Sequence, residues 1–286
     1  MRVAVLGTGI MGRPNAERLI KAGQRVTVYN RTTRKTQPLA ALGAVVAASP
    51  AEAIAAAEVI LVMLADFPAV RSVLFQNPRP NLRGRTVIQM STIGVAESCT
   101  LAQRVRRAGG NYLECPVLGS RQEVENGSLI LMAGASRAQF KQWSPFLGKL
   151  GRRLFYVGPV GQAAGLKLAF NQMIAALGTG FALSAAFVKK SKINCELFWD
   201  ILRQSALVCP MFEKKWPRLH KRDYKNPNFP TQLLLKDVKL FVAEARRLGL
   251  RTDSLNGSQR ILTQTIRQGL AQVDYVAVFE TILQGK

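Results

Sequence analysis

Gly7, Gly9 and Gly12 have the GxGxxG spacing, directly after an apolar run and before a helical pattern. In this context the first glycine permits a tight turn, and the second lets the backbone approach a pyrophosphate. The third lets the helix pack closely on the strand. The helix N-terminus that follows would present free N–H groups to the phosphates. The motif, which includes Ile10 and Met11, therefore predicts a dinucleotide site; the alternative is an ordinary glycine-rich turn.

The end of the second predicted strand indicates which dinucleotide binds. A site for NAD usually has Asp or Glu about 20 residues after the glycine turn, where the carboxylate accepts a hydrogen bond from the ribose 2′-OH. This sequence has no carboxylate there; it has Asn30, Arg31, Thr32, Thr33, Arg34 and Lys35. Because cations and hydroxyls suit a 2′-phosphate, the pattern favours NADP(H), with Arg31 stacked on the adenine. The alternative is a solvated basic turn.

Lys167 and Asn171 are four residues apart in a long apolar helical pattern, so both project from one face of the helix. Apolar surroundings lower the pKa of a lysine and make it a usable proton donor. Such an ammonium would protonate the alkoxide that forms when a carbonyl accepts a hydride. Asn171 would orient the lysine or bind the substrate. The alternative for Lys167 is a side chain that extends from a core helix to water.

The elements that must position these residues divide the chain in two. Up to Gly158, short β-branched runs alternate with helical patterns such as 11–22 and 96–108, which predicts a parallel sheet with crossover helices. The expected strands are 3–6, 25–29, 44–47, 59–64, 86–90, 112–114, 129–133 and 154–157, and Pro78 and Pro80 mark a loop. After Pro159 only helices are expected, at 161–190, 196–204, 230–248, 254–268 and 274–283. The predicted fold is a Rossmann-type doubly wound α/β domain over 1–158, then an all-α domain over 159–286, bridged by the first of these helices.

The composition is that of a folded protein with a large basic excess. The 286 residues are 48% hydrophobic and 20% charged, which excludes intrinsic disorder. The net charge of +23 indicates anionic partners. No basic tail is present, so phosphorylated small molecules are favoured over nucleic acid. The most apolar stretch, 169–188, is interrupted by polar residues and predicts a core helix rather than a membrane span.

The cysteines and the histidine bear on metal binding and compartment. Cys99, Cys115, Cys195 and Cys209 form no CxxC pair, and His220 is the single histidine, so a zinc site has too few clustered ligands. The cysteines are expected to be reduced and mostly buried, as in a cytoplasmic protein.

Several motifs occur in one order along the chain. They are Gly7–Gly12, Asn30-Arg31-Thr32, Met63-Leu64-Ala65-Asp66, Ser91-Thr92-Ile93, the run 115–120 (CPVLGS), Gly165-Leu166-Lys167 with Asn171, and Lys236-Asp237. This order resembles the β-hydroxyacid dehydrogenases, the 3-hydroxyisobutyrate dehydrogenase family, over essentially the whole chain. Within that family the sequence looks most like the NADPH-dependent glyoxylate/succinic semialdehyde reductases.

The resemblance implies roles for further residues. Met63 and Leu64 would line the cofactor groove, and Lys236 would reach the cofactor from the helical domain. Thr92 would lie near the nicotinamide or the substrate; alternatively, it is the N-cap of the next helix. In addition, Phe229 and Asp237 would wall the active site.

One position departs from the family pattern. Leu118 stands where the family normally has a serine that holds the substrate carboxylate with the N–H groups that follow. Gly119 and Ser120 remain, so an anion cradle is still expected there, but a more apolar aldehyde, ketone or imine becomes a plausible substrate.

The resemblance implies NADPH-dependent reduction of a small aldehyde or keto acid, such as glyoxylate or succinic semialdehyde, with Lys167 as proton donor. It also implies a homodimer, or a tetramer, formed through the helical domain. One alternative is an imine reductase, although these enzymes usually lack the lysine at 167. Phe170 disfavours 6-phosphogluconate dehydrogenase, which would have histidine there. The other alternative, suggested by the charge and by Leu118, is a non-catalytic protein that binds a dinucleotide or nucleic acid.

Overall fold

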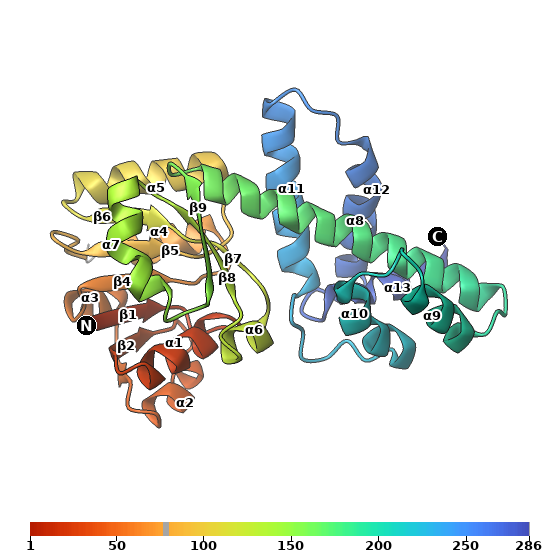
Figure 1. Ribbon diagram of the computed structural model, residues 1–286, viewed down its shortest axis with the longest axis horizontal. Helices are drawn as coiled ribbons and strands as arrows, with labels where there is room; N and C mark the ends of the chain where they lie inside the picture. The colour runs from red at the N-terminus through yellow and green to blue at the C-terminus, as the bar shows by residue number, and fades with distance from the viewer. Residues whose placement is uncertain (77–79, 286) are drawn as a thin grey trace. The chain divides into compact units, whose positions relative to one another are not determined.

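The computed structural model describes residues 1–76 and 80–285; Pro78 of the expected loop lies outside the described residues. These residues form two compact units, Met1–Lys167 and Leu168–Lys286. The first unit is built on a mainly parallel sheet (Figure 1). Its described strands are β1 (Arg2–Leu6), β2 (Arg25–Tyr29), β3 (Val45–Val46), β4 (Val59–Val62), β5 (Thr86–Gln89), β6 (Asn111–Glu114), β7 (Val117–Leu118), β8 (Ile130–Gly134) and β9 (Arg153–Gly158).

The strand order is β3-β2-β1-β4-β5-β6-β8-β7, with β9 paired to β8. Strands β1 to β6 are parallel, as the sequence predicts. The expectation of a wholly parallel sheet is wrong for β8, which runs antiparallel to β6 and to the unexpected strand β7. The segment between β6 and β8 holds only β7 and the short helix α6 (Arg121–Glu125), so no full crossover helix returns the chain to the starting edge.

Both faces of this sheet are covered by helices. Along β1, Val3 and Val5 belong to one hydrophobic cluster and Ala4 and Leu6 to another, because successive side chains of a strand point to opposite faces. The first cluster includes residues of α1 (Gly12–Lys21), α2 (Gln37–Ala40), α6 and α7 (Arg137–Leu147). The second includes residues of α3 (Pro50–Ala55), α4 (Phe67–Phe75) and α5 (Val95–Arg107). The doubly wound architecture expected from the sequence is therefore confirmed.

In the second unit the described elements are helices joined by loops. Its elements are α8 (Gln162–Lys190), which begins in the first unit, α9 (Cys195–Gln204), α10 (Pro210–Lys221), α11 (Thr231–Arg247), α12 (Asp253–Arg267), a 3₁₀ turn (Tyr275–Ala277) and α13 (Val278–Gln284). Helix α10 was not expected, because Pro217 and several lysines interrupt its apolar pattern. The Trp216 ring of α10 nevertheless stacks on the Trp199 ring, with the two ring centroids 5.2 Å apart.

Helix α8 was expected to be a core helix rather than a membrane span. By length and composition α8 could cross a membrane; half of its most apolar window is buried in the protein, as in the core helix of a globular protein. None of the four cysteines, all of which the structure describes, forms a disulfide, but only Cys115 is buried, so the expectation that most are buried is wrong. The other three lie at or near helices on the outside of the cores, where their side chains are partly exposed.

Candidate active site

The glycine turn joins β1 to α1, and its three glycines have different surroundings. Gly7 has φ +99°, and a Cβ on Gly7 would overlap the carbonyl oxygen of Met63. A Cβ on Gly12 would overlap the carbonyl oxygen of Gly7. A Cβ on Gly9, which is exposed, would meet no atom within 4 Å. Packing within the protein therefore explains why Gly7 and Gly12 are glycines. Gly9 leaves open space beside the turn, which close approach of a pyrophosphate requires.

Asn30 joins the end of β2 to this turn. Its Oδ1 accepts a hydrogen bond from the Thr8 N–H at 3.1 Å, and its Nδ2 donates to the Thr32 carbonyl at 3.0 Å. The Thr8 hydroxyl also donates to the Lys35 carbonyl at 3.2 Å. Residues 31–35 are exposed and include no carboxylate. The loop is thus fixed by its backbone and by Asn30, and the side chains of Arg31, Thr32 and Arg34 remain available to a 2′-phosphate.

Met63, Leu64 and Thr92 lie just beyond the carboxyl ends of β4 and β5, the edge at which the glycine turn leaves β1. Met63 is buried beneath Gly12, and the Leu64 N–H donates to the Ser91 hydroxyl at 2.8 Å. Thr92 is half-buried. Strand order reverses between β1 and β4, and in open α/β sheets ligands bind at that reversal.

In the expected anion cradle, the carboxylate of a nearby glutamate already accepts hydrogen bonds. Leu118 is half-buried in β7, and Gly119 is exposed with φ +137°. The N–H and the hydroxyl of Ser120 both donate to one carboxylate oxygen of Glu123, each at 2.6 Å. Glu123 was not among the expected site residues, although a serine followed three residues later by Glu is the pattern of a capping box. Two donors of the expected cradle, the N–H and the hydroxyl of Ser120, are therefore already hydrogen-bonded within the protein.

A second missed residue is Glu114, at the carboxyl end of β6 and 1% exposed. One carboxylate oxygen accepts hydrogen bonds from the N–H groups of Gly161, Ala163 and Ala164 at 2.8, 2.9 and 3.1 Å. The other accepts a short hydrogen bond from the Ser98 hydroxyl. Burial raises the pKa of Glu114, and these four hydrogen bonds oppose the rise. The signal in the sequence was a carboxylate within a strand that is otherwise buried.

In the second unit, three of the expected residues come together. The Asn171 amide nitrogen donates to one oxygen of Asp237 at 2.6 Å, and the Lys236 ammonium pairs with the other at 2.8 Å. Asn171 and Asp237 are 1% and 2% exposed. The buried Asn171 Oδ1 has no hydrogen-bond partner among the described residues. Because Asp237 holds the amide nitrogen, the oxygen is the end left to accept a donor from a ligand or from a neighbouring side chain.

Lys167 is half-buried on α8, four residues before Asn171. One helical turn separates the two residues, so they share a face of the helix. The expected proton donor thus precedes, on a continuous helix, the amide that Asp237 orients.

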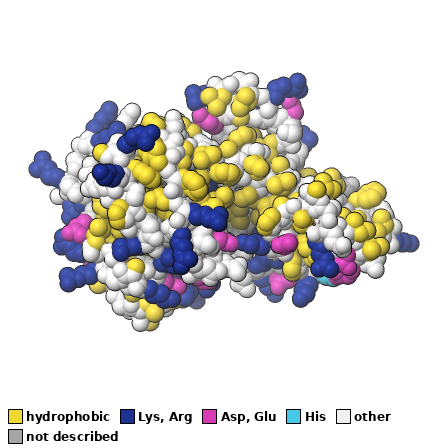
Figure 2. Space-filling model, in the orientation of Figure 1, with side chains coloured by type: hydrophobic (Ala, Val, Ile, Leu, Met, Phe, Trp, Pro, Cys, Tyr) yellow, Lys and Arg dark blue, Asp and Glu magenta, His cyan; other side chains and the backbone are white. Residues whose placement is uncertain are grey.

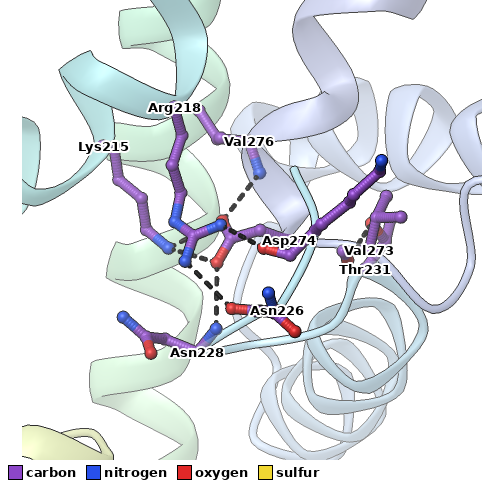
Figure 3. Close-up of polar contacts among 9 residues, drawn as sticks. Lys215, Arg218, Asn226, Asn228, Thr231, Val273, Asp274 and Val276 are labelled. Atoms are coloured by element: carbon purple, nitrogen blue, oxygen red, sulfur yellow. Dashed lines mark hydrogen bonds and ion pairs between the residues drawn. The ribbon is translucent and has the colours of Figure 1, made fainter. Parts of the chain in front are cut away.

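Phe229 lies in the loop before α11, the helix that carries Lys236 and Asp237. Its ring packs edge-on against Tyr275 at 6.1 Å. The loop is tied down by Asp274, which is fully buried and pairs with the Lys215 ammonium through both oxygens at 2.7 Å (Figure 3). Asp274 also accepts hydrogen bonds from the N–H groups of Asn228 and Val276. Burial lowers the pKa of Lys215, and the Asp274 carboxylate opposes this.

Comparisons with known proteins agree with both units. Residues 2–158 match the family described as the NAD binding domain of 6-phosphogluconate dehydrogenase, and 161–282 match the NAD-binding domain of NADP-dependent 3-hydroxyisobutyrate dehydrogenase. The chain is 33% identical to glyoxylate/succinic semialdehyde reductase 1 of Arabidopsis thaliana, covering 99% of this chain and 98% of the relative. This chain belongs to the 3-hydroxyisobutyrate dehydrogenase family.

Further relatives support the assignment to this dehydrogenase family. The 2-hydroxy-3-oxopropionate reductase of Escherichia coli is 30% identical over 99% of this chain and 97% of its own length. A crystal structure of 3-hydroxyisobutyrate dehydrogenase from Salmonella typhimurium has the same fold, with a TM-score of 0.90 at 22% identity, covering 98% of this chain and 99% of that one. The resemblance seen in the motifs is confirmed: the protein is an NAD(P)-dependent hydroxyacid dehydrogenase or reductase, and it binds NADP(H).

Proposed function

We propose that this dehydrogenase reduces a small aldehyde or keto acid to the hydroxy acid with NADPH, and that Lys167 donates the proton. The observation that carries the proposal is the polar chain Lys236–Asp237–Asn171, in which Asp237 and Asn171 are buried. Its unpaired acceptor, Asn171 Oδ1, belongs to a residue one helical turn from Lys167. A buried acceptor without a partner is costly, so such an atom indicates a ligand or a donor that binds there during the reaction.

The charges of Lys167 and Asp237 suggest what each residue does during carbonyl reduction. When bound, NADPH supplies the hydride, which adds to the carbonyl carbon. The Lys167 ammonium then stabilises the negative charge that develops on the carbonyl oxygen and transfers a proton from Nζ to that oxygen, giving the alcohol. Asn171 Oδ1 accepts a hydrogen bond from the ammonium or from the new hydroxyl, and Asp237 keeps the amide in the orientation that allows this.

The substrate class is constrained by the loop after β6. The relatives named above are reductases of glyoxylate, succinic semialdehyde and 2-hydroxy-3-oxopropionate, all of which carry a carboxylate. In this chain Leu118 brings an apolar side chain to the loop, and Glu123 occupies both donors of Ser120. A carboxylate substrate would lack these donors and would lie beside the apolar Leu118 side chain, so we propose that small acids bind weakly and that less charged carbonyl compounds are preferred.

The test is a screen of NADPH oxidation over small aldehydes, keto acids and imines, each matched in size. We expect turnover with aldehydes or keto acids. Turnover with imines alone would contradict carbonyl reduction and favour imine reductase activity. No turnover, together with salt-sensitive DNA binding, would instead favour a non-catalytic role for the basic surface.

We further propose that the protein acts as a homodimer through the exposed apolar face of α8. Met173, Leu177, Leu183 and Phe187 share this face and are 41–67% exposed, and hydrophobic side chains gather over the helical unit (Figure 2). Family resemblance supports a second copy of this chain as the partner that covers the face.

In light scattering, the mass of the native protein should be twice that of the chain, and Phe187→Glu should yield monomers. As control, Leu248→Glu replaces a similarly exposed apolar residue at the C-cap of α11 and should leave the dimer intact; a native monomer would contradict the proposal.

A further inference from the structure

The first turn of α8 is capped by a residue from another strand. The leading N–H groups of a helix lack partners within the helix and are usually bonded by the side chain of the N-cap residue. Gly161, which precedes α8, has no side chain. Glu114, at the end of β6, supplies the acceptor instead, and one of its oxygens takes all three N–H groups, from Gly161, Ala163 and Ala164. A carboxylate also suits the positive end of the helix dipole.

The space around this carboxylate leaves no alternative position. A Cβ on Gly134 of β8 would overlap the same oxygen of Glu114, so that oxygen lies directly against the β8 backbone. The other oxygen is held by the Ser98 hydroxyl, which also contacts the Tyr112 hydroxyl at 2.8 Å. Thus β6 and β8 hold the oxygen that caps α8, and that oxygen fixes the start of the helix; the Ser98 hydrogen bond is made to the other oxygen.

Lys167 lies three and four residues after Ala164 and Ala163, on the turn that follows the capped one. In a helix, the direction of each side chain is set by the rotation and rise of the preceding turn. Any shift of the first turn therefore moves the Lys167 side chain. For a group that transfers a proton, misplacement by about 1 Å can lower the rate roughly 10²-fold.

We infer that Glu114 is a positioning residue for Lys167: by capping α8 from β6, it sets where the ammonium stands at the sheet edge. This inference rests on the proposed role of Lys167. It differs from a stabilising role alone in that a displaced cap should lower kcat without weakening NADPH binding, since β1, with its glycine turn, is separated from β6 by β4 and β5.

Two variants should displace the capping carboxylate from the first turn of α8 without removing it. Glu114→Asp retains the charge but is one methylene shorter, and Gly134→Ala pushes the carboxylate from behind. Two controls keep the cap in place. Glu114→Gln can still accept the three N–H groups and donate to Ser98, whereas Ser98→Ala removes a hydrogen bond to the carboxylate from outside α8. Measurements are kcat and KM, the Kd for NADPH, the Tm, and amide hydrogen exchange over 161–167.

We expect Glu114→Asp and Gly134→Ala to lower kcat about 10-fold to 10²-fold and to speed exchange over 161–167, with the Kd for NADPH within about twofold of native. Glu114→Gln should recover most of the native kcat. Ser98→Ala should lower the Tm comparably yet keep kcat. Native kcat and native exchange in both displaced variants, or an equal fall of kcat in Ser98→Ala, would overturn the inference. If Lys167→Ala keeps its turnover, the proposed proton donor is wrong; exchange over 161–167 then still reports whether Glu114 positions the turn.

Discussion

The glycine turn of the first unit and the polar chain of the second are built from different parts of the protein. The turn consists of backbone, its shape is set by contacts within Gly7–Gly12 and with Met63, and its sequence is contiguous. The chain Lys236–Asp237–Asn171 consists of side chains, and its hydrogen bond joins residues 66 apart in the sequence. The first suits a constant ligand, the cofactor, while the second can orient a reacting group.

This difference suggests a division of labour that can be tested. Changes in the turn and the loop after β2 should alter the affinity for NADPH and leave the chemical step intact. Changes on the face of α8 that includes Asn171 should alter turnover and leave NADPH affinity intact. Variants that violate this separation would show that the two regions act as one.

The largest effect is expected for Lys167→Ala. Loss of a positioned acid typically lowers kcat by roughly 10²–10⁴, and the affinity for NADPH should stay within about twofold because the phosphate contacts are elsewhere. Steady-state kinetics and NADPH fluorescence titration provide the two values. Lys190→Ala, at the exposed end of the same helix, is the matched control and should match the native enzyme in both. Weakened NADPH binding in Lys167→Ala would make this lysine a cofactor ligand.

Next come two glycines of one turn with opposite expected outcomes. Gly12→Ala forces a methyl group onto the Gly7 carbonyl and should destabilise the fold by about 1–3 kcal/mol or more. Gly9→Ala meets open space, so its free energy of unfolding should change by less than about 0.5 kcal/mol, while the Kd for NADPH rises about 10-fold or more. Denaturant unfolding and NADPH titration distinguish them. Native NADPH affinity in Gly9→Ala would place the pyrophosphate away from this turn.

These contrasts also show why sequence predicted one region better than the other. Local sterics and periodicity determine the glycine spacing, the strands β1 to β6 and the basic loop after β2. These features can therefore be predicted from the sequence. Helical spacing indicated Asn171 and family resemblance indicated Asp237, but their mutual contact depends on how α8 packs on α11. Glu123 had a local signal, the capping box with Ser120, which was overlooked. Glu114 was missed because its role appears only when its donors, from the distant Ser98 and the start of α8, are known.

Cofactor choice tests the loop after β2. Arg31 is exposed beside the turn and is expected to bond the 2′-phosphate, so NADPH should bind at least about 10-fold more tightly than NADH. Arg31→Asp should erase or reverse this preference. Arg25→Asp, at the opposite end of β2, changes the net charge equally and should leave the preference unchanged. Equal native affinities for both cofactors would refute the role given to this loop.

Substitution of Leu118 tests whether the segment after β6 contacts the substrate. A hydroxyl that bonds a carboxylate contributes about 1.5–3 kcal/mol, so Leu118→Ser should lower the KM for a carboxylate-bearing aldehyde roughly 10-fold. An uncharged aldehyde of similar size should change less, because it offers no carboxylate to bond. The decisive values are kcat/KM for both substrates in both proteins. Equal changes for the two would mean that Leu118 does not face the substrate carboxylate.

The smallest effect concerns the helical unit, whose side-chain ties can titrate, unlike the glycine turn. Burial opposes ionisation of Glu280, but hydrogen bonds from Arg222 and Tyr224 outweigh it and lower the pKa of Glu280. A lowered folded-state pKa stabilises the protein above the ordinary Glu value of about 4.3, and this stabilisation is lost as the pH falls through the folded-state pKa. Glu280→Gln should therefore be less stable than native at pH 7, by under about 1 kcal/mol because Arg222 is largely exposed, and the gap should close below about pH 4.3. Glu244→Gln, at an exposed ion pair of α11 with Arg247, is the control for loss of a surface charge. A gap that persists unchanged at low pH would mean that Glu280 stabilises the unit through packing, and that its charge is irrelevant.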